Sequence, residues 1–180
     1  QVDSKKNVAP VDSFTANLTK LQNEAFINIG VTREVTEGER RVAIVPSAVK
    51  RLLQAGMQVI IESKAGAAGE FLDDQFKAMG AKIMPDASSV YNQADIIIKI
   101  QEPKVHPSTG KHEIDMVPSG KTLISFVGPR TDAGKELMNR AASAGITLLA
   151  VDAIPRISRA QSLDVLSSQA KVAGYRAVIE

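Results

Sequence analysis

The chain has 180 residues, enough for one domain with a sizeable core, and its 22 basic and 20 acidic residues leave a net charge of +2. This near balance indicates neither a nucleic-acid partner nor an acidic one, and an aromatic content of 4% without Trp argues against a stacking surface for single strands. The absence of cysteine excludes disulfides, thiol chemistry and cysteine-ligated metals.

Residues 1–26 are expected to form a tail or linker. The first ten residues are polar, and a short amphipathic helix is then indicated by Phe14, Leu18, Leu21 and Ala25. Because the chain begins with Gln1 and no apolar leader follows, we expect a processed product or a piece of a longer protein. No apolar run approaches the roughly 20 residues that cross a bilayer, which predicts a soluble chain.

From Ile27 onward, short β-branched runs alternate with helix-like segments. Strands are expected at 27–31, 58–62, 95–100, 121–126 and 146–151. Helices are expected at 46–55, 73–79, 86–93 and 133–144. This alternation predicts an α/β fold with an open, mostly parallel sheet and helices on both faces, a Rossmann- or flavodoxin-like lobe. We assign the lobe to residues 27–161.

Two connecting segments have no predicted chemistry. Residues 101–120 are rich in Pro, His, Gly and Lys and are expected to be a long surface excursion. His106 and His112 lie in it, and loop exposure explains them more simply than a metal site, so no metal is expected. The segment 66–69 reads GAAG; it lacks the third glycine of a dinucleotide-binding fingerprint and the lysine of a Walker loop, which favours a plain turn.

The segment 155–169 is unusually polar for a connection between a strand and a helix, with the sequence PRISRAQSLDVLSSQ. Arg156 and Asp164 can form a charge-assisted pair, while Gln161 offers both a donor and an acceptor, the mixture that a carboxamide such as nicotinamide requires. The alternative is a polar helix start, with Ser162 or Asp164 as the cap. A helix over 162–180 is indicated by the spacing of Leu163, Leu166, Ala170, Ala173 and Ala177.

These residues resemble a known family. The motif PRISRAQSLD-x-LSS, followed by AGYRA at 173–177, resembles the signature loop of the NAD(H)-binding component of proton-translocating NAD(P) transhydrogenase. Upstream, GERRVAIVP at 38–46 and IIIKI at 96–100 resemble segments shared with alanine dehydrogenase, a relative of that component. The resemblance runs from about Ile27 to Glu180.

The resemblance implies that the chain is a fragment of an enzyme that transfers hydride from NADH to NADP+, coupled to proton translocation. It implies that the NAD(H) nicotinamide is held by Arg156, Gln161, Asp164 and Ser167. Within this set Gln161 is the expected catalytic residue, lying toward the second nucleotide. The helix 162–180 would lead to a missing NAD-binding Rossmann lobe, because no G-x-G-x-x-G occurs in the chain. We therefore expect this fragment to be inactive alone and to bind NADH weakly.

The resemblance also implies partners. An NADP(H)-binding component would carry NADP(H), a membrane component would translocate protons, and the NAD(H) component would form a homodimer. The expected location is a soluble domain peripheral to a membrane complex, in a bacterial inner membrane or a mitochondrial or other organellar inner membrane.

Two further residues bear on the choice of enzyme. In alanine dehydrogenases the residues matching Arg41 and Lys99 bind the keto acid, whereas a transhydrogenase needs no keto acid, so we interpret the pair as a vestigial substrate site. For Lys99 the alternative is a strand-end lysine that reaches water. An alanine dehydrogenase-like NAD-dependent amino-acid oxidoreductase stays open, although SFVGP at 125–129 lacks that enzyme's histidine. A non-catalytic dimerisation lobe also stays open.

The sequence departs from the usual family pattern at two positions. Thr32 and Lys171 replace the usual proline and asparagine of the family.

Overall fold

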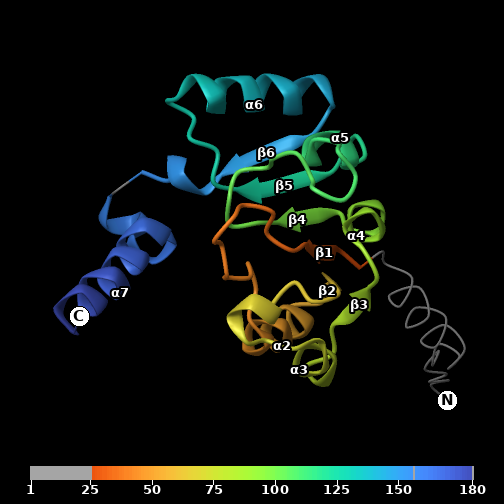
Figure 1. The fold of residues 1–180 in the computed structure, drawn as a ribbon, viewed down its shortest axis with the longest axis horizontal. Coiled ribbons are helices and arrows are strands. Elements are labelled where there is room, and N and C mark those ends of the chain that lie inside the picture. The colour runs from red at the N-terminus through yellow and green to blue at the C-terminus, as the bar shows by residue number, and fades with distance from the viewer. Residues whose placement is uncertain (1–25, 156, 180) are drawn as a thin grey trace, which may run out of the picture.

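A computed structural model of the chain describes residues 26–155 and 157–179. Among these residues, six parallel strands form one sheet in the order β3-β2-β1-β4-β5-β6 (Figure 1). The strands are β1 (Asn28–Val31), β2 (Gln58–Glu62), β3 (Lys82–Met84), β4 (Ile96–Ile98), β5 (Thr122–Ser125) and β6 (Thr147–Ala150). The α-helices are α2 (Pro46–Gln54), α3 (Asp73–Ala78), α4 (Ala87–Gln93), α5 (Glu113–Met116), α6 (Asp132–Ser143) and α7 (Val165–Ile179). The predicted α/β fold with an open parallel sheet is confirmed.

Successive strands are added to one side of β1 up to β3 and to its other side from β4 onward. The chain first builds outward through β2 and β3, then returns to the other side of β1 and builds through β4, β5 and β6. At such a switch point the loops that follow the two central strands diverge, and a crevice opens at the carboxyl ends of the strands. In Figure 1 these ends point toward the side of the molecule on which α7 lies.

Helices cover both faces of the sheet, but not equally. One face packs Ile97 and Leu123 against α4, α5 and α6. The other face packs Val31 and Ile61 against α2 and α3, which lie over the β1–β3 half of the sheet. Leu149, which pairs in register with Ile124 on that second face, is 50% exposed. The β4–β6 half of the second face therefore has less cover than its β1–β3 half.

Gly30 lets α4 lie directly on β1. A Cβ atom at this position would sit 2.5 Å from the Cβ of Ala94 and 2.9 Å from Cγ1 of Val90, closer than van der Waals contact permits. Asp86 starts α4 by accepting a hydrogen bond from the Ser89 N–H at 2.8 Å. This close packing holds Tyr91 fully buried against the sheet.

The segment 101–120 is more than a surface excursion. It contains α5, whose Ile114 is fully buried and completes the core between α4 and α6. His106 is buried too, with Ser108 Oγ 2.9 Å from its Nδ1, so the prediction that both histidines are exposed was wrong for His106. His112 accepts the Ile114 N–H at 3.2 Å and thereby starts α5. The described residues contain no group of three or more His, Cys, Asp or Glu able to hold a metal ion.

The two ends of the chain are only partly described. The tail helix expected within residues 1–26 lies almost wholly outside the described residues. At the other end, residues 158–163 form a 3-10 helix, η3 (Ser158–Leu163), and the expected helix over 162–180 is observed as α7 from Val165. Among the described helices, none combines the length and the apolar character that a bilayer crossing requires.

Candidate functional site

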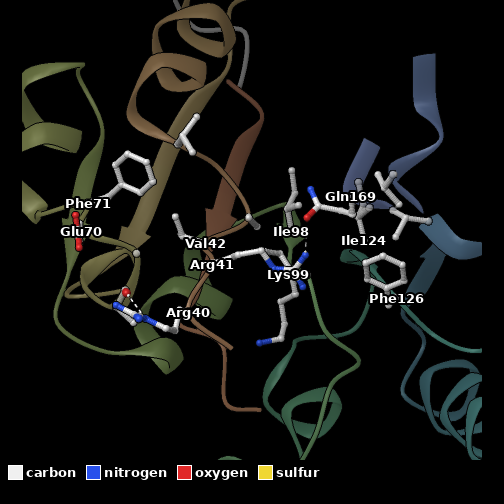
Figure 2. A pocket seen from close by; sticks show the side chains of 17 residues that line it. Arg40, Arg41, Val42, Glu70, Phe71, Ile98, Lys99, Ile124, Phe126 and Gln169 are labelled. Carbon is white, nitrogen blue, oxygen red and sulfur yellow. Dashed lines mark hydrogen bonds between the residues drawn. The ribbon is translucent and has the colours of Figure 1, made fainter. Parts of the chain in front are cut away.

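A cavity of about 600 Å³ opens at the carboxyl ends of the central strands, where the strand order reverses (Figure 2). Its lining is mainly apolar and includes Val42, Val45, Phe71, Ile98, Ile124, Phe126 and Val151. Arg40 and Arg41 contribute from the loop after β1, and Val165 and Gln169 contribute from the first turns of α7. The turn expected at 66–69 is a single 3-10 turn, η1 (Ala67–Gly69), that forms part of the wall.

Lys99 directly follows β4 and has no access to water. Its Nζ lies 2.9 Å from Oε1 of Glu113 and 3.5 Å from Oε2 of Glu34, and it donates to the Arg33 carbonyl at 3.4 Å. The side chains of Lys99 and both carboxylates are almost fully buried. A lone buried ammonium would be strongly unfavourable, and these partners supply the compensation. The alternative in which the Lys99 amine reaches water is therefore wrong.

The two carboxylates join Lys99 to the surrounding backbone. Glu34 accepts the N–H groups of Ile100 at 2.7 Å and Gln101 at 3.2 Å, so it ties the loop after β1 to the end of β4. Glu113 accepts the Lys104 N–H at 3.0 Å with its other oxygen. Lys99 is thus the centre of a buried network that fixes the two strand ends at the switch point.

Tyr91 extends this network to β1. Its hydroxyl donates to Oε1 of Glu113 at 2.8 Å, and Thr32 Oγ1 lies 3.4 Å from the same hydroxyl. Burial and the nearby Glu113 carboxylate raise the pKa of Tyr91 well above its usual value, so the phenol stays protonated. Thr32, which replaces the usual proline, therefore supplies a hydroxyl that contacts Tyr91, and proline has none.

Arg41 lies at the rim of the cavity and is about half exposed. Its Nε donates to Oε1 of Glu39 at 2.8 Å, and its Nη2 donates to Oε2 of Glu39 at 2.6 Å. Glu39 also accepts from Nε2 of Gln101 at 2.6 Å. These contacts, the Arg41 pair foremost, lower the pKa of Glu39 to about 2, so the carboxylate stays ionised at neutral pH.

The remaining terminal nitrogen of Arg41 points to α7. Its Nη1 donates to Oε1 of Gln169 at 3.1 Å, and Figure 2 shows Arg41 and Gln169 facing each other, with the Lys99 side chain running away from them. Arg41 and Lys99 therefore line one cavity but face different partners. Gln169 was not predicted as a site residue, because nothing in the local sequence shows which distant side chain will face Arg41. Glu39, only two positions before Arg41, was not predicted as a site residue either.

The polar loop before α7 ends in a helix cap. Asp164 accepts the N–H of Ser167 at 3.2 Å and its hydroxyl at 2.6 Å, as a residue preceding a helix does. Asp164 and Ser167 are thus brought together next to Val165, which lines the cavity. The Gln161 side chain is exposed in η3 and does not line the cavity, and Arg156 lies outside the described residues.

Comparisons with known proteins agree with this geometry. The sequence model of the family "Alanine dehydrogenase/PNT, N-terminal domain" matches residues 30–173, which is most of the chain. The chain belongs to this family. It is 41% identical over 154 residues to NAD(P) transhydrogenase subunit alpha of Cereibacter sphaeroides, which covers 86% of this chain and 28% of that protein. It is 31% identical over 152 residues to alanine dehydrogenase of Methanococcus maripaludis, which covers 83% of this chain and 38% of that protein.

A solved structure supports the same assignment. The transhydrogenase from Sinorhizobium meliloti superposes with a TM-score of 0.75 at 36% identity, covering 84% of this chain and 43% of that one. The chain therefore spans less than half the length of the relatives it matches. In this alanine dehydrogenase/PNT N-terminal domain, the matched region includes the sheet except for the first two residues of β1, the cavity and the first turns of α7.

A second cavity of about 600 Å³ lies beside the polar loop of this family member. It is lined by residues 128–131 after β5 and residues 152–155 after β6. Asp152 connects its two sides by accepting the N–H groups of Val127 at 3.2 Å and Gly128 at 2.7 Å. Asp152 thereby fixes the segment that leads into the loop.

Proposed function

We propose that this chain is the N-terminal lobe of the NAD(H)-binding component of a proton-translocating NAD(P) transhydrogenase, which transfers hydride from NADH to NADP+. One observation carries the choice between this function and amino-acid oxidation. Both cations that could clamp a keto acid are already engaged, Arg41 by Glu39 and Lys99 by Glu113 and Glu34. The cavity is thus suited to a neutral ring rather than to an anion.

Charge explains this preference. The contacts of Arg41 and Lys99 bring three carboxylates against two cations, so a keto acid would add a further negative charge to a region that is already net negative. Displacing Glu113 or Glu34 from Lys99 would leave a carboxylate buried without its partner. A nicotinamide ring brings no carboxylate, and its apolar faces match side chains such as Ile98, Ile124 and Phe126.

The residues of the polar loop suit the edge of such a ring. Asp164 and Ser167, which bond to each other, flank Val165 of the cavity wall and supply a carboxylate and a hydroxyl, and Gln161 in the preceding η3 adds a carboxamide donor and acceptor. We assign ring contacts to Arg156, Asp164 and Ser167, and orientation of the ring toward the second nucleotide to Gln161. When bound, NAD(H) supplies the hydride, while these side chains supply binding and orientation.

The comparisons add support. Identity to the transhydrogenase subunit of Cereibacter sphaeroides is 41%, against 31% to the alanine dehydrogenase of Methanococcus maripaludis. The proposal includes the rest of the assembly: a second lobe for NAD(H), a domain that holds NADP(H), a proton-translocating membrane component and a homodimer of the NAD(H) component. This lobe would then lie at the surface of a membrane complex.

Two assays of the full-length protein, assembled with the component that holds NADP(H), test the function. Reduction by NADH of an NADP+ analogue with a distinct absorbance should proceed, whereas oxidation of NADH with pyruvate and ammonium should not. Turnover with pyruvate and ammonium, without reduction of the analogue, would overturn the proposal.

A substitution tests the role given to Gln161. The variant Gln161→Ala should slow hydride transfer by at least tenfold while changing the NADH dissociation constant by less than threefold, because the side chain positions the ring rather than holding it. Arg159→Ala, an exposed neighbour in η3, is the matched control and should retain most of the rate. Equal losses of rate and affinity in Gln161→Ala would contradict the positioning role.

A further inference from the structure

The first turns of α7 are joined to the sheet by a polar bridge. Gln169 in α7 accepts from Nη1 of Arg41, although the two residues are 128 positions apart in the chain. Glu39 binds the other side of the Arg41 guanidinium through Nε and Nη2, and Gln101 donates to Glu39. The bridge thus connects the loop after β1, the segment after β4 and α7, the three walls that meet at the cavity.

Beyond this bridge, most of α7 is exposed to solvent. From Gln169 to Ile179 every residue is exposed, and Val172, Tyr175 and Val178 are among the most exposed apolar or aromatic side chains of the described chain. In Figure 1 the helix extends away from the sheet. Because residues 169–179 are exposed, packing does little to fix the direction of this part of α7, so a directional contact at Gln169 has a large influence on where it points.

We infer that Arg41 is a positioning residue, which fixes the direction of α7 over the cavity through Gln169 while Glu39 holds its guanidinium in place. This inference deepens the proposed function, on which its consequence for hydride transfer rests. The planar guanidinium suits the role because its donors diverge in one plane, so one side can bind Glu39 and the opposite nitrogen can reach Gln169. Lysine cannot bridge in this way, because its ammonium is a single point of charge.

The consequence for the cavity is direct. Val165 and Gln169 form its α7 wall, and Asp164 and Ser167 lie on the same turn. When the bridge is lost, α7 and the end of the polar loop at Asp164 change their distance from Ile98 and Ile124 on the opposite wall. The geometry of the ring contacts then loosens without the loss of any residue that touches the ring.

The test follows α7 itself, in the full-length protein, by hydrogen exchange of the backbone amides of residues 168–174. Arg41→Ala and Gln169→Ala should each raise exchange at least fivefold, and the double variant should exchange no faster than either single one, because both remove the same contact. Arg41→Lys should not restore protection. Arg40→Ala is the matched control: Arg40 lines the same cavity but donates to the Ala68 carbonyl, so α7 should exchange as in the unchanged protein.

Unchanged exchange in Arg41→Ala, or additive effects in the double variant, would overturn the inference. A kinetic arm separates positioning from direct binding: Arg41→Ala should lower kcat about tenfold with KM for NADH changed by less than threefold. A large rise in KM with α7 undisturbed would make Arg41 a ligand-binding residue and overturn the inference. If the protein shows no transhydrogenation but the exchange results hold, the proposed function fails and the role of Arg41 in placing α7 stands.

Discussion

Arg41 and Lys99 are two cations at one cavity, and their surroundings differ in burial. Lys99 is enclosed with Glu34 and Glu113, and each of these carboxylates also holds backbone N–H groups. Arg41 is about half exposed, and it binds Glu39 on one side and an exposed helix on the other. The comparison teaches that a positive charge at the cavity does not by itself determine what the residue does. The buried cation has become part of the core, whereas the exposed cation connects two parts of the molecule.

The largest test of this difference removes a partner of the buried cation. In Glu113→Ala the ammonium of Lys99 loses its closest carboxylate, and both the Lys104 N–H and the Tyr91 hydroxyl lose an acceptor. We expect the free energy of unfolding to fall by about 3–5 kcal/mol, as measured by urea denaturation.

Asp115→Ala in the same short helix is the matched control. Asp115 pairs with Arg140 at 2.6 Å, but both side chains are more than 40% exposed. Solvent screens such a pair, so the loss should be about 0–1 kcal/mol. Equal losses in the two variants would contradict the distinction between buried and exposed pairs.

A smaller effect is expected where the network reaches β1. Tyr91→Phe removes a buried hydroxyl that donates to Glu113 and contacts Thr32. The free energy of unfolding should fall by about 2 kcal/mol, because a buried hydrogen bond to a carboxylate is lost and the Thr32 hydroxyl is left without this partner. Tyr175→Phe is the control, since Tyr175 is 73% exposed, and it should change stability by less than about 0.5 kcal/mol. A Tyr91→Phe variant as stable as the control would show that the hydroxyl network contributes little.

The smallest effect concerns the exposed bridge and depends on pH. The pKa of Glu39 falls from 4.5 to about 2 on folding, so its pairing with Arg41 stabilises the protein above pH 4.5 and is lost as the pH falls toward 2. Glu39→Gln should therefore be less stable than the unchanged protein by about 1 kcal/mol at pH 6, a figure discounted because Arg41 is about half exposed. Urea denaturation at pH 6, 4 and 3 should show this difference shrinking with acidity; a constant difference would mean that ionisation of Glu39 is not its source.

Much of the fold was predictable because strand and helix patterns are local. The β-branched runs and the glycines that follow the helices placed five strands and four helices within one residue of their observed bounds, except β4, which ends two residues early, at Ile98 rather than residue 100. The omitted strand β3 has three residues at the sheet edge, too few to show an alternation. The omitted helix α5 has four residues, less than the span from which a helical period is read.

The site was predictable in its residues more than in its contacts. Arg41, Lys99 and Asp164 were singled out from the sequence, and Arg41 and Lys99 do line one cavity. Their partners Gln169, Glu34 and Glu113 could not be found, because each pairing joins segments that meet only when the parallel strands bring their carboxyl ends together. The helix cap at Asp164 was foreseen as an alternative, because a cap requires only local residues.

The close approach at Gly30 carries a consequence for the buried charges. An alanine there would push α4 away from β1, because its methyl group would collide with Ala94 and Val90. Tyr91 belongs to the same helix and would be lifted away from Glu113, on which Lys99 depends. A methyl group added at Gly30 would thus weaken the ion pair of Lys99, although the two residues are not in contact.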